Sequence, residues 1–432
     1  KFTPGVTVES VETDRTYFTS RGFDITNFQF DGVGIPFTWG GQEGSPDLAP
    51  FERIEVVRGA NGLMSGSGNP SATVNFVRKR PTADPLARID LTAGSWDKRR
   101  IEADVSGALS DAGNVRGRAA YAHEKGNSYL DRYALEKHVF YGVLEADLGE
   151  ATVFSLGHTL NESQADSPMW GALPLFDSLG RSTHLSRSTS TAADWAWWNN
   201  QEGRTFAELT HSFANDWQAR GTLTYVKKES DSALFYVLGT PDAATGQGLS
   251  GYPSLYEGET RQWLADLSLS GPFRLAGREH ELMLGANWYK SEVEDLSFYI
   301  PGFFVPVPTK DIYAGDFPKP ASWVNPDGAE YEDRQKSFYT AARLSLSDAL
   351  SLVLGARAIK LETSGQSYGV DRAREDDDIL PYAGLVYDLN EQFSVYASYT
   401  EIFNPQKEMG ADLRRLDPIE GENYEVGIKG EL

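Results

Sequence analysis

Four tryptophans lie close together in the chain, in the segments SPMWGALPLF and ADWAWWNN. They are Trp170, Trp195, Trp197 and Trp198. Aromatic faces offer a large contact area at a small cost in conformational entropy, so this group could bind a bulky organic ligand. If the chain is extended here, Trp195 and Trp197 point to the same side. The alternative roles are an aromatic girdle at a membrane interface and packing within a loop.

Further aromatic candidates lie in two other segments. SALFYVLG contains Tyr236, with Phe235 beside it and Tyr252 further along the chain. The glycine-flanked segment IPFTWGG contains Phe37 and Trp39. Flanking glycines favour a bend at which large side chains are exposed. We therefore predict a ligand site built from the aromatic side chains of several loops.

The residue types that usually carry catalysis or bind metals do not form recognisable groups in the sequence. The chain has no cysteine and no G-x-S-x-G segment, and its six histidines show neither i,i+4 nor H-E-x-x-H spacing. We therefore expect no enzymatic activity and no zinc site of a recognised kind. The acidic run 376–378 could bind calcium or form a solvated surface.

Charge and hydropathy exclude two classes of protein. The 432 residues carry a formal net charge of −22, whereas nucleic-acid binding needs a cationic surface for phosphates. No stretch approaches the roughly 18 apolar residues of a transmembrane helix. Membrane-spanning strands remain compatible with this composition, because they alternate between lipid-facing and lumen-facing residues.

The chain has two parts of different character. Residues 1–81 contain short β-branched runs separated by Gly and Pro, whereas residues 82–432 contain long runs with a period of two. In WLADLSLSG, for example, Trp263 and Leu267 share one face, and Asp266 lies on the other. We count about 14 such segments of about 9–12 residues, which is the length of a tilted membrane strand. We therefore predict two domains with these bounds.

Short and long connections alternate along the second part of the chain. Strict alternation places all long loops on one rim of an antiparallel meander, as in bacterial outer-membrane barrels. The alternative is a large secreted all-β protein. The short connections are 110–114, 148–151, 214–217, 347–351 and 389–392, and the long ones are 125–137, 162–202, 230–259, 291–333, 363–378 and 403–421.

A glycine-rich segment ends the first part of the chain, with Gly59, Gly62, Gly66 and Gly68. Glycine permits positive φ and close backbone approach, so we expect tight turns in a crowded space such as a barrel lumen. A phosphate-binding loop is not indicated, because the segment lacks G-K-[ST] and the third glycine of a dinucleotide-binding turn.

The segment FERIEVVRGANGLMSGSGNPSATVNFVRKRPT resembles the end of the plug domain of TonB-dependent outer-membrane receptors. Upstream, SRGFDITNFQFDGVGIP resembles the plug segment that carries an Arg-Gly-Phe element, and DPIEGENYEVGIKGEL resembles a late barrel element of the same family. The segment GLMSGSGNPSATVNFVRKRP is similar to the corresponding segment of the subgroup that takes up ferric hydroxamate and pyoverdine-type siderophores.

This resemblance implies an all-β transmembrane barrel with an N-terminal α+β plug domain in its lumen. Residues 1–81 would be the C-terminal part of the plug, and residues 82–432 the N-terminal part of the barrel. The family barrel has about 22 strands, of which about 14 are covered here, so we expect the chain to be truncated at both ends.

The resemblance also implies a function and a set of partners. The protein would be an outer-membrane receptor and TonB-dependent active transporter for a ferric siderophore in a Gram-negative bacterium. Its partners would be the siderophore, the TonB–ExbB–ExbD energy-coupling complex and outer-membrane lipid with lipopolysaccharide, and it would act as a monomer. No cofactor is expected, because the iron arrives already chelated.

Several plug residues acquire roles from the resemblance. In this family the apex of the plug touches the ligand, which supports Phe37 and Trp39 as ligand contacts. Arg21 would either contact an anionic siderophore or anchor the plug. An arginine of the VVRG element, here Arg58, would meet a lumenal glutamate. In ENYEVGIK the apolar side chains share one face, so Glu425 faces the lumen, and we predict an Arg58–Glu425 contact.

Other functions remain as alternatives. The same architecture could serve a receptor for cobalamin, haem or an oligosaccharide, because tryptophans also stack on sugars. A passive porin or an adhesin is a different class, but a porin needs an open lumen and the first domain would fill it. A secreted β-rich hydrolase is disfavoured because no catalytic group is recognisable.

Overall fold

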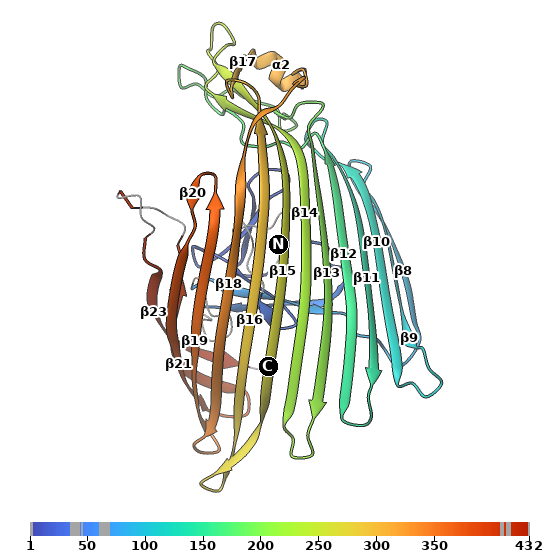
Figure 1. The fold of residues 1–432 in the computed structure, drawn as a ribbon, viewed down its shortest axis with the longest axis vertical. Helices are drawn as coiled ribbons and strands as arrows, with labels where there is room; N and C mark the ends of the chain where they lie inside the picture. The colour runs from blue at the N-terminus through green and yellow to red at the C-terminus, as the bar shows by residue number, and fades with distance from the viewer. Residues whose placement is uncertain are drawn as a thin grey trace.

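The structure is a computed structural model that describes residues 3–34, 44, 46–59, 70–406, 410–411 and 416–430. A large curved sheet forms a wall, and the N-terminal strands lie behind it in the view of Figure 1. Side chains of these strands contact the sheet, as described below. The predicted barrel wall with a plug on its inner side is therefore confirmed.

The plug consists of two small sheets in its described residues. One has the order β1-β2-β3 and the other the order β5-β4-β7-β6, with β4 and β7 parallel. Ile25, Phe28, Ala72, Val74 and Phe76 form the buried core of the second sheet. The strands are β1 (Thr7–Ser10), β2 (Thr16–Ser20), β3 (Phe23–Asp24), β4 (Asn27–Phe30), β5 (Val33–Gly34), β6 (Phe51–Arg58) and β7 (Ala72–Arg78).

None of the described plug residues is helical, so the helical component of the predicted α+β plug is not seen among them. The parallel β4–β7 pair joins segments on either side of the glycine-rich stretch. Gly59 is described and has φ +105°, which only glycine adopts without strain. The other three glycines of the predicted turns lie outside the described residues.

The wall is a sixteen-stranded antiparallel sheet, in which β17 and β20 are short side pairings and the other strands follow in sequence order from β8 to β23. This order is the predicted meander, with the expected number of long strands. They are β8 (Leu86–Ala93), β9 (Arg99–Ala108), β10 (Val115–Asn127), β11 (Ala134–Asp147), β12 (Thr152–Asp166), β13 (Trp197–Ser212), β14 (Gln218–Gly239), β15 (Leu249–Leu275), β16 (Arg278–Tyr299), β17 (Val305–Val307), β18 (Val324–Ser345), β19 (Leu350–Ser367), β20 (Val370–Asp371), β21 (Arg374–Asp388), β22 (Phe393–Asn404) and β23 (Ile419–Gly430).

Alternation along each strand separates an inward face from an outward face. On β15, Leu264 is 3% exposed, whereas the outward Leu267 is 65% exposed. Outward residues such as Leu223 and Phe338 are also exposed, which forms an apolar surface suited to lipid. None of the described helices is long and apolar enough to cross a membrane.

Long connections gather at one rim and tight turns at the other (Figure 1). The long rim carries β17 and the short helix α2 (Thr309–Ala314). The short turns match the prediction, but the strands continue further toward the long rim than expected. Most of the predicted loop 230–259 is strand, because β14 extends to Gly239 and β15 begins at Leu249.

One hairpin turn was not predicted. Ala276 and Gly277 connect β15 to β16, with φ values of 51° and 79°. Two central residues with positive φ are typical of a two-residue hairpin turn that matches the twist of the strands. The connection between β7 and β8 contains the predicted domain boundary after residue 81.

Candidate ligand site and plug–barrel interface

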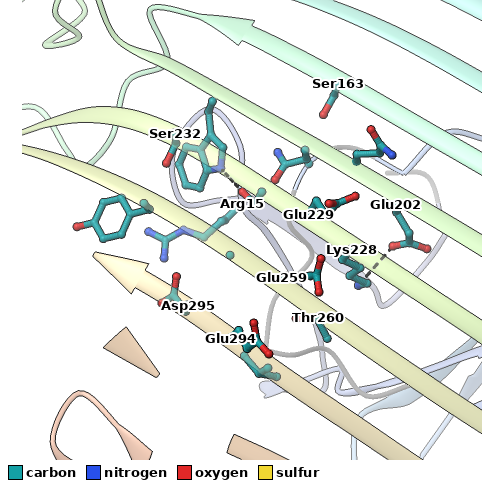
Figure 2. A pocket seen from close by; sticks show the side chains of 18 of the residues that line it. Arg15, Ser163, Glu202, Lys228, Glu229, Ser232, Glu259, Thr260, Glu294 and Asp295 are labelled. Atoms are coloured by element: carbon teal, nitrogen blue, oxygen red, sulfur yellow. Dashed lines mark hydrogen bonds and ion pairs between the residues drawn. The ribbon is translucent and has the colours of Figure 1, made fainter. Parts of the chain in front are cut away.

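A cavity of 330 Å³ lies between the plug and the inner wall of the barrel (Figure 2). The plug contributes Arg15 and Tyr17, and strands β12 to β16 contribute most of the other lining residues. Aromatic and small polar side chains alternate around it. The principal ones are Trp170, Trp198, Tyr256, Asn161, Ser163, Asn200, Ser232, Thr260 and Tyr368.

Trp198 and Trp170 form the aromatic part of this wall. Trp198 is buried, its Nε1 donates to Ser230 Oγ at 3.3 Å, and the Arg15 guanidinium lies 6.0 Å from its ring centroid. Trp170 comes from the connection after β12 and packs edge-on against Tyr236 and Tyr256, at 5.2 and 5.5 Å between ring centroids. Tryptophans from two different segments therefore meet at one cavity.

Several charged groups around the cavity have partners within the protein. Lys228 Nζ lies 3.4 Å from Glu202 Oε2 in the barrel wall, and Arg15 Nε lies 2.5 Å from Glu12 Oε1 in the plug. On β16, Asp295 accepts a hydrogen bond from the Tyr368 hydroxyl. The lining contains five carboxylates and two cations, so a ligand meets acidic groups as well as aromatic faces.

Two residues that line the cavity have a side-chain amide oxygen without a hydrogen-bond partner. Among the residues that the structure describes, the Oδ1 atoms of Asn161 and Asn200 are buried and have no hydrogen-bond partner. A buried acceptor without a partner is costly, so such atoms commonly bind a donor that is absent from the protein itself. The cavity therefore suits a ligand that combines a flat aromatic portion with N–H or O–H donors.

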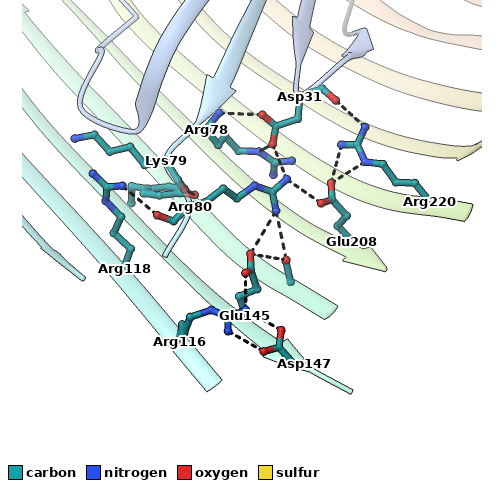
Figure 3. A network of polar contacts seen from close by, with 12 residues as sticks. Asp31, Arg78, Lys79, Arg80, Arg116, Arg118, Glu145, Asp147, Glu208 and Arg220 are labelled. Carbon is teal, nitrogen blue, oxygen red and sulfur yellow. Dashed lines mark hydrogen bonds and ion pairs between the residues drawn. The ribbon is translucent and has the colours of Figure 1, made fainter. Parts of the chain in front are cut away.

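Below this cavity, ion pairs join the plug to the barrel (Figure 3). Asp31, in the turn between β4 and β5, accepts hydrogen bonds from the Arg78 backbone N at 2.9 Å and from its Nε at 2.6 Å. Arg80 lies between Asp31 and Glu208, with Nη2 2.8 Å from the Glu208 carboxylate. Arg220 of β14 pairs with the same carboxylate at 2.7 Å and donates to the Asp31 carbonyl at 2.9 Å.

Two barrel side chains also hold the backbone of the last plug residues. The Tyr141 hydroxyl donates to the Lys79 carbonyl at 2.6 Å, and Arg118 Nη1 donates to the Arg80 carbonyl at 3.0 Å. Lys79 Nζ lies 2.8 Å from Asp104 on β9. The segment that leaves the plug is therefore fixed through both its backbone and its side chains.

Asp47 forms a second anchor between plug and barrel. Arg100 of β9 donates to both of its carboxylate oxygens, at 2.7 and 2.8 Å, and Lys137 of β11 lies 3.3 Å away. Burial alone would raise the pKa of Asp47, but the Arg100 hydrogen bonds and the Lys137 charge lower this pKa to about 2. Asp47 is therefore a carboxylate at any physiological pH.

Both halves of the chain match one known family. Residues 150–432 match the family described as "TonB dependent receptor-like, beta-barrel", and residues 1–73 match the "TonB-dependent Receptor Plug Domain". The chain belongs to the TonB-dependent receptor family. The predicted resemblance is therefore confirmed.

Relatives of this TonB-dependent receptor chain include pyoverdine receptors. It is 39% identical to the "Ferripyoverdine receptor" of Pseudomonas aeruginosa, covering 100% of this chain and 53% of the relative. It is 38% identical to the "Ferric-pyoverdine BN7/BN8 receptor" of Pseudomonas putida, covering 99% and 54%. The chain spans about half the length of these curated relatives.

A solved structure of a relative has the same fold. The crystal structure of the ferripyoverdine receptor of the outer membrane of Pseudomonas aeruginosa bound to ferripyoverdine has a TM-score of 0.90 and 36% identity. The alignment covers 99% of this chain and 57% of that one. The siderophore subgroup predicted for this TonB-dependent receptor is therefore also supported by its relatives.

The structure separates the four predicted tryptophans of this TonB-dependent receptor. Trp170 and Trp198 line the cavity, whereas Trp195 packs against Phe317 and donates its Nε1 to the Phe317 carbonyl at 2.8 Å. Trp195 lies in a turn before β13, so it does not alternate with Trp197 as an extended chain would require. Trp197 is the residue before Trp198 on β13 and therefore lies on the opposite face.

The remaining aromatic candidates occupy different surroundings. Tyr236 packs on Trp170 and closely against Gly171, where a Cβ atom would lie 2.4 Å from the tyrosine ring. Phe235 is buried in a cluster beneath the loops, and Tyr252 stacks on Tyr299 at 5.5 Å. The predicted apex residues, Phe37 and Trp39, lie outside the described residues.

The predicted Arg58–Glu425 contact differs from the observed one. Glu425 Oε2 lies 3.3 Å from Nη1 of Arg21, and its Oε1 accepts a hydrogen bond from the Tyr396 hydroxyl at 2.6 Å. Arg58 instead donates to the Pro4 carbonyl at 3.4 Å. The backbone at Gly59 lies against the carboxylate, where an added Cβ atom would be 3.3 Å from Glu425 Oε2. Arg21 thus has the anchoring contact that was assigned to Arg58.

The acidic run 376–378 does not form a ligand cage. These residues lie within strand β21, where successive side chains point to opposite faces, so the three carboxylates do not converge. Asp376 pairs with Arg374.

Sequence reasoning did not identify Arg15, Tyr256, Asn161 or Asn200. They lie far apart in the chain and meet only through the register of β12 to β15 and the position of the plug.

Proposed function

We propose that the full protein is an outer-membrane receptor and TonB-dependent transporter of a Gram-negative bacterium that takes up a ferric siderophore of the pyoverdine class. The cavity between plug and barrel carries this proposal, because it combines Trp170 and Trp198 with the unpartnered amide oxygens of Asn161 and Asn200. Pyoverdine receptors among its relatives support the ligand class. The iron arrives within its chelate, so the protein needs to hold only the organic shell and requires no cofactor.

The plug–barrel contacts suit a domain that must be held and then moved. Charged side chains in a hydrated lumen can exchange protein partners for water one at a time, whereas an apolar core must be exposed as a whole. The TonB–ExbB–ExbD complex would supply the work that displaces the plug. The exposed apolar outward face would contact membrane lipid and lipopolysaccharide, with the protein acting as a monomer.

A titration of the full-length receptor tests this function. The purified protein in detergent is titrated with ferric pyoverdines, a ferric hydroxamate, vitamin B12, haem and an oligosaccharide while tryptophan fluorescence is recorded. We expect saturable quenching at low micromolar or lower concentration with at least one ferric pyoverdine. Iron-limited growth of a deletion strain, fed one purified siderophore at a time, should select the same compound. Binding of B12, haem or sugar with no response to any ferric siderophore would overturn the proposal.

A further inference from the structure

A cluster of side chains outside the lumen has the composition of a metal site. His123 lies on β10, and Glu136 and His138 lie on β11. The two histidines are directly opposite each other in the antiparallel register. Their neighbours Ala122 and Val139 are buried on the inner face, so the cluster lies on the outward face, near the rim with the long connections.

The donor atoms of these three side chains converge. His123 Nε2 lies 3.0 Å and His138 Nε2 lies 3.6 Å from the same carboxylate oxygen, Glu136 Oε1. One donor atom from each side chain lies within 4.8 Å of the others. Donors bound to a zinc ion at about 2.1 Å are about 3.4 Å apart in a tetrahedral arrangement. A small rotation of one imidazole therefore brings all three donors to bonding distance of one ion.

Neighbouring residues hold the donors in place. Tyr121 Oη is hydrogen-bonded to His138 Nδ1 at 3.0 Å, which leaves Nε2 directed at Glu136. This arrangement is the outer hydrogen bond that usually orients a metal-binding histidine. Lys125 Nζ lies 2.7 Å from Glu136 Oε2, so the oxygen that faces the histidines, Oε1, remains available.

The two imidazoles are held side by side at the wall. Their rings stack with centroids 4.4 Å apart and an interplanar angle of 11°. Glu162 on β12 is directly opposite His138 in the register, which places a further carboxylate on the same row of the sheet.

We propose that His123, Glu136 and His138 bind a divalent transition-metal ion, with Zn²⁺ as the best match to two imidazoles and one carboxylate. Strands supply the donors, so the site is rigid and leaves at least one coordination position open on the outward side. The bound ion ties β10 to β11 just beyond the exposed Tyr121 and Phe140. This site is independent of the siderophore cavity.

Metal titration of the full-length receptor, purified without a histidine tag, tests this site. Zn²⁺ binding is measured by calorimetry, and Co²⁺ binding by its visible absorption bands. We expect one site in the wild type. His123→Ala, His138→Ala and Glu136→Gln should each lower Zn²⁺ affinity by at least about tenfold, and Tyr121→Phe by a smaller factor.

His158→Ala is the matched control, because His158 lies on β12 and hydrogen-bonds Thr205 away from the cluster. It should bind Zn²⁺ as the wild type does. Zn²⁺ should also raise the thermal midpoint of the wild type but not that of the H123A/H138A double variant. Heat-modifiable mobility in gels verifies that each variant folds, and E136Q keeps the test valid if an alanine variant does not. Equal Zn²⁺ binding by wild type and double variant, or no binding by the wild type, would overturn the site.

Discussion

The plug–barrel interface and the ligand cavity use charged residues in opposite ways. At the interface, Arg80 and Arg220 form pairs that join plug to barrel. At the cavity, the ion pair of Lys228 lies within the barrel wall and that of Arg15 lies within the plug. The interface charges thus join the two domains, whereas these two ion pairs at the cavity each stay within one domain and leave the aromatic faces to a ligand. Different groups of residues therefore hold the plug and line the ligand cavity.

The largest effect should come from removing Asp31. Its loss leaves Arg78, which is 4% exposed, without its carboxylate partner, and an uncompensated buried charge costs about 3–5 kcal/mol. Asp31→Ala should make the plug markedly more sensitive to urea and to protease, while ligand affinity of the molecules that remain folded changes little. Asp84→Ala, in an exposed turn, is the control. Equal protease sensitivity of both variants would contradict the role of Asp31 in holding the plug.

Removing Trp198 should have the converse effect. Trp198→Ala deletes one aromatic wall of the cavity, and we expect siderophore affinity to fall by about 2 kcal/mol, or roughly thirtyfold. Plug stability should be unchanged. Trp197→Ala is the matched control, because this neighbouring residue lies on the opposite face of β13. Fluorescence titration measures affinity, and an equal loss in both variants would contradict the placement of the cavity.

Acid should weaken the anchor that Asp47 forms between plug and barrel. Because the folded pKa of Asp47 is lowered to about 2, its contribution is present above its ordinary pKa and is lost as pH falls from about 4 through 2. Protonation of Asp47 should lower the free energy of unfolding by about 2 kcal/mol. Plug stability of the wild type should fall across this range, and Asp47→Asn should remove that part of the pH dependence. An unchanged slope in D47N would show that other groups carry it.

The smallest effect concerns the exposed pair at Glu425. Arg21 is 44% exposed in its side chain, and pairs of this kind contribute about 0.2–1 kcal/mol. A double-mutant cycle of Arg21→Ala with Glu425→Gln should give a coupling energy in this range. The parallel cycle of Arg58→Ala with Glu425→Gln should give nearly zero, and the reverse result would restore the pairing first predicted from the sequence.

The strands and their order could be predicted from the sequence, because lipid on one side and a wet lumen on the other impose a period of two on every segment. The turns at 148–151 and 389–392 could be predicted for the same reason, because the period of two stops there. The upper ends of β14 and β15 could not be predicted. At the upper end of β14 both faces of the strand are covered, so Leu234 and Phe235 are both buried and the alternation that marks a strand disappears.

Contacts between distant strands were the other part that the sequence could not supply. His123 and His138 lack any recognised metal spacing, yet the register of one hairpin places them side by side. Arg21 and Glu425 are separated by 404 positions, and only the depth of the plug in the barrel decides which arginine reaches the glutamate. Spacing along a strand fixes the face of a residue but not its height relative to another strand.

Strand β15 is 27 residues long, which corresponds to about 90 Å of extended chain at about 3.3 Å per residue. The apolar belt of such a protein is only about 25 Å tall. The wall therefore extends well beyond the height of such a belt, on the side of the long connections.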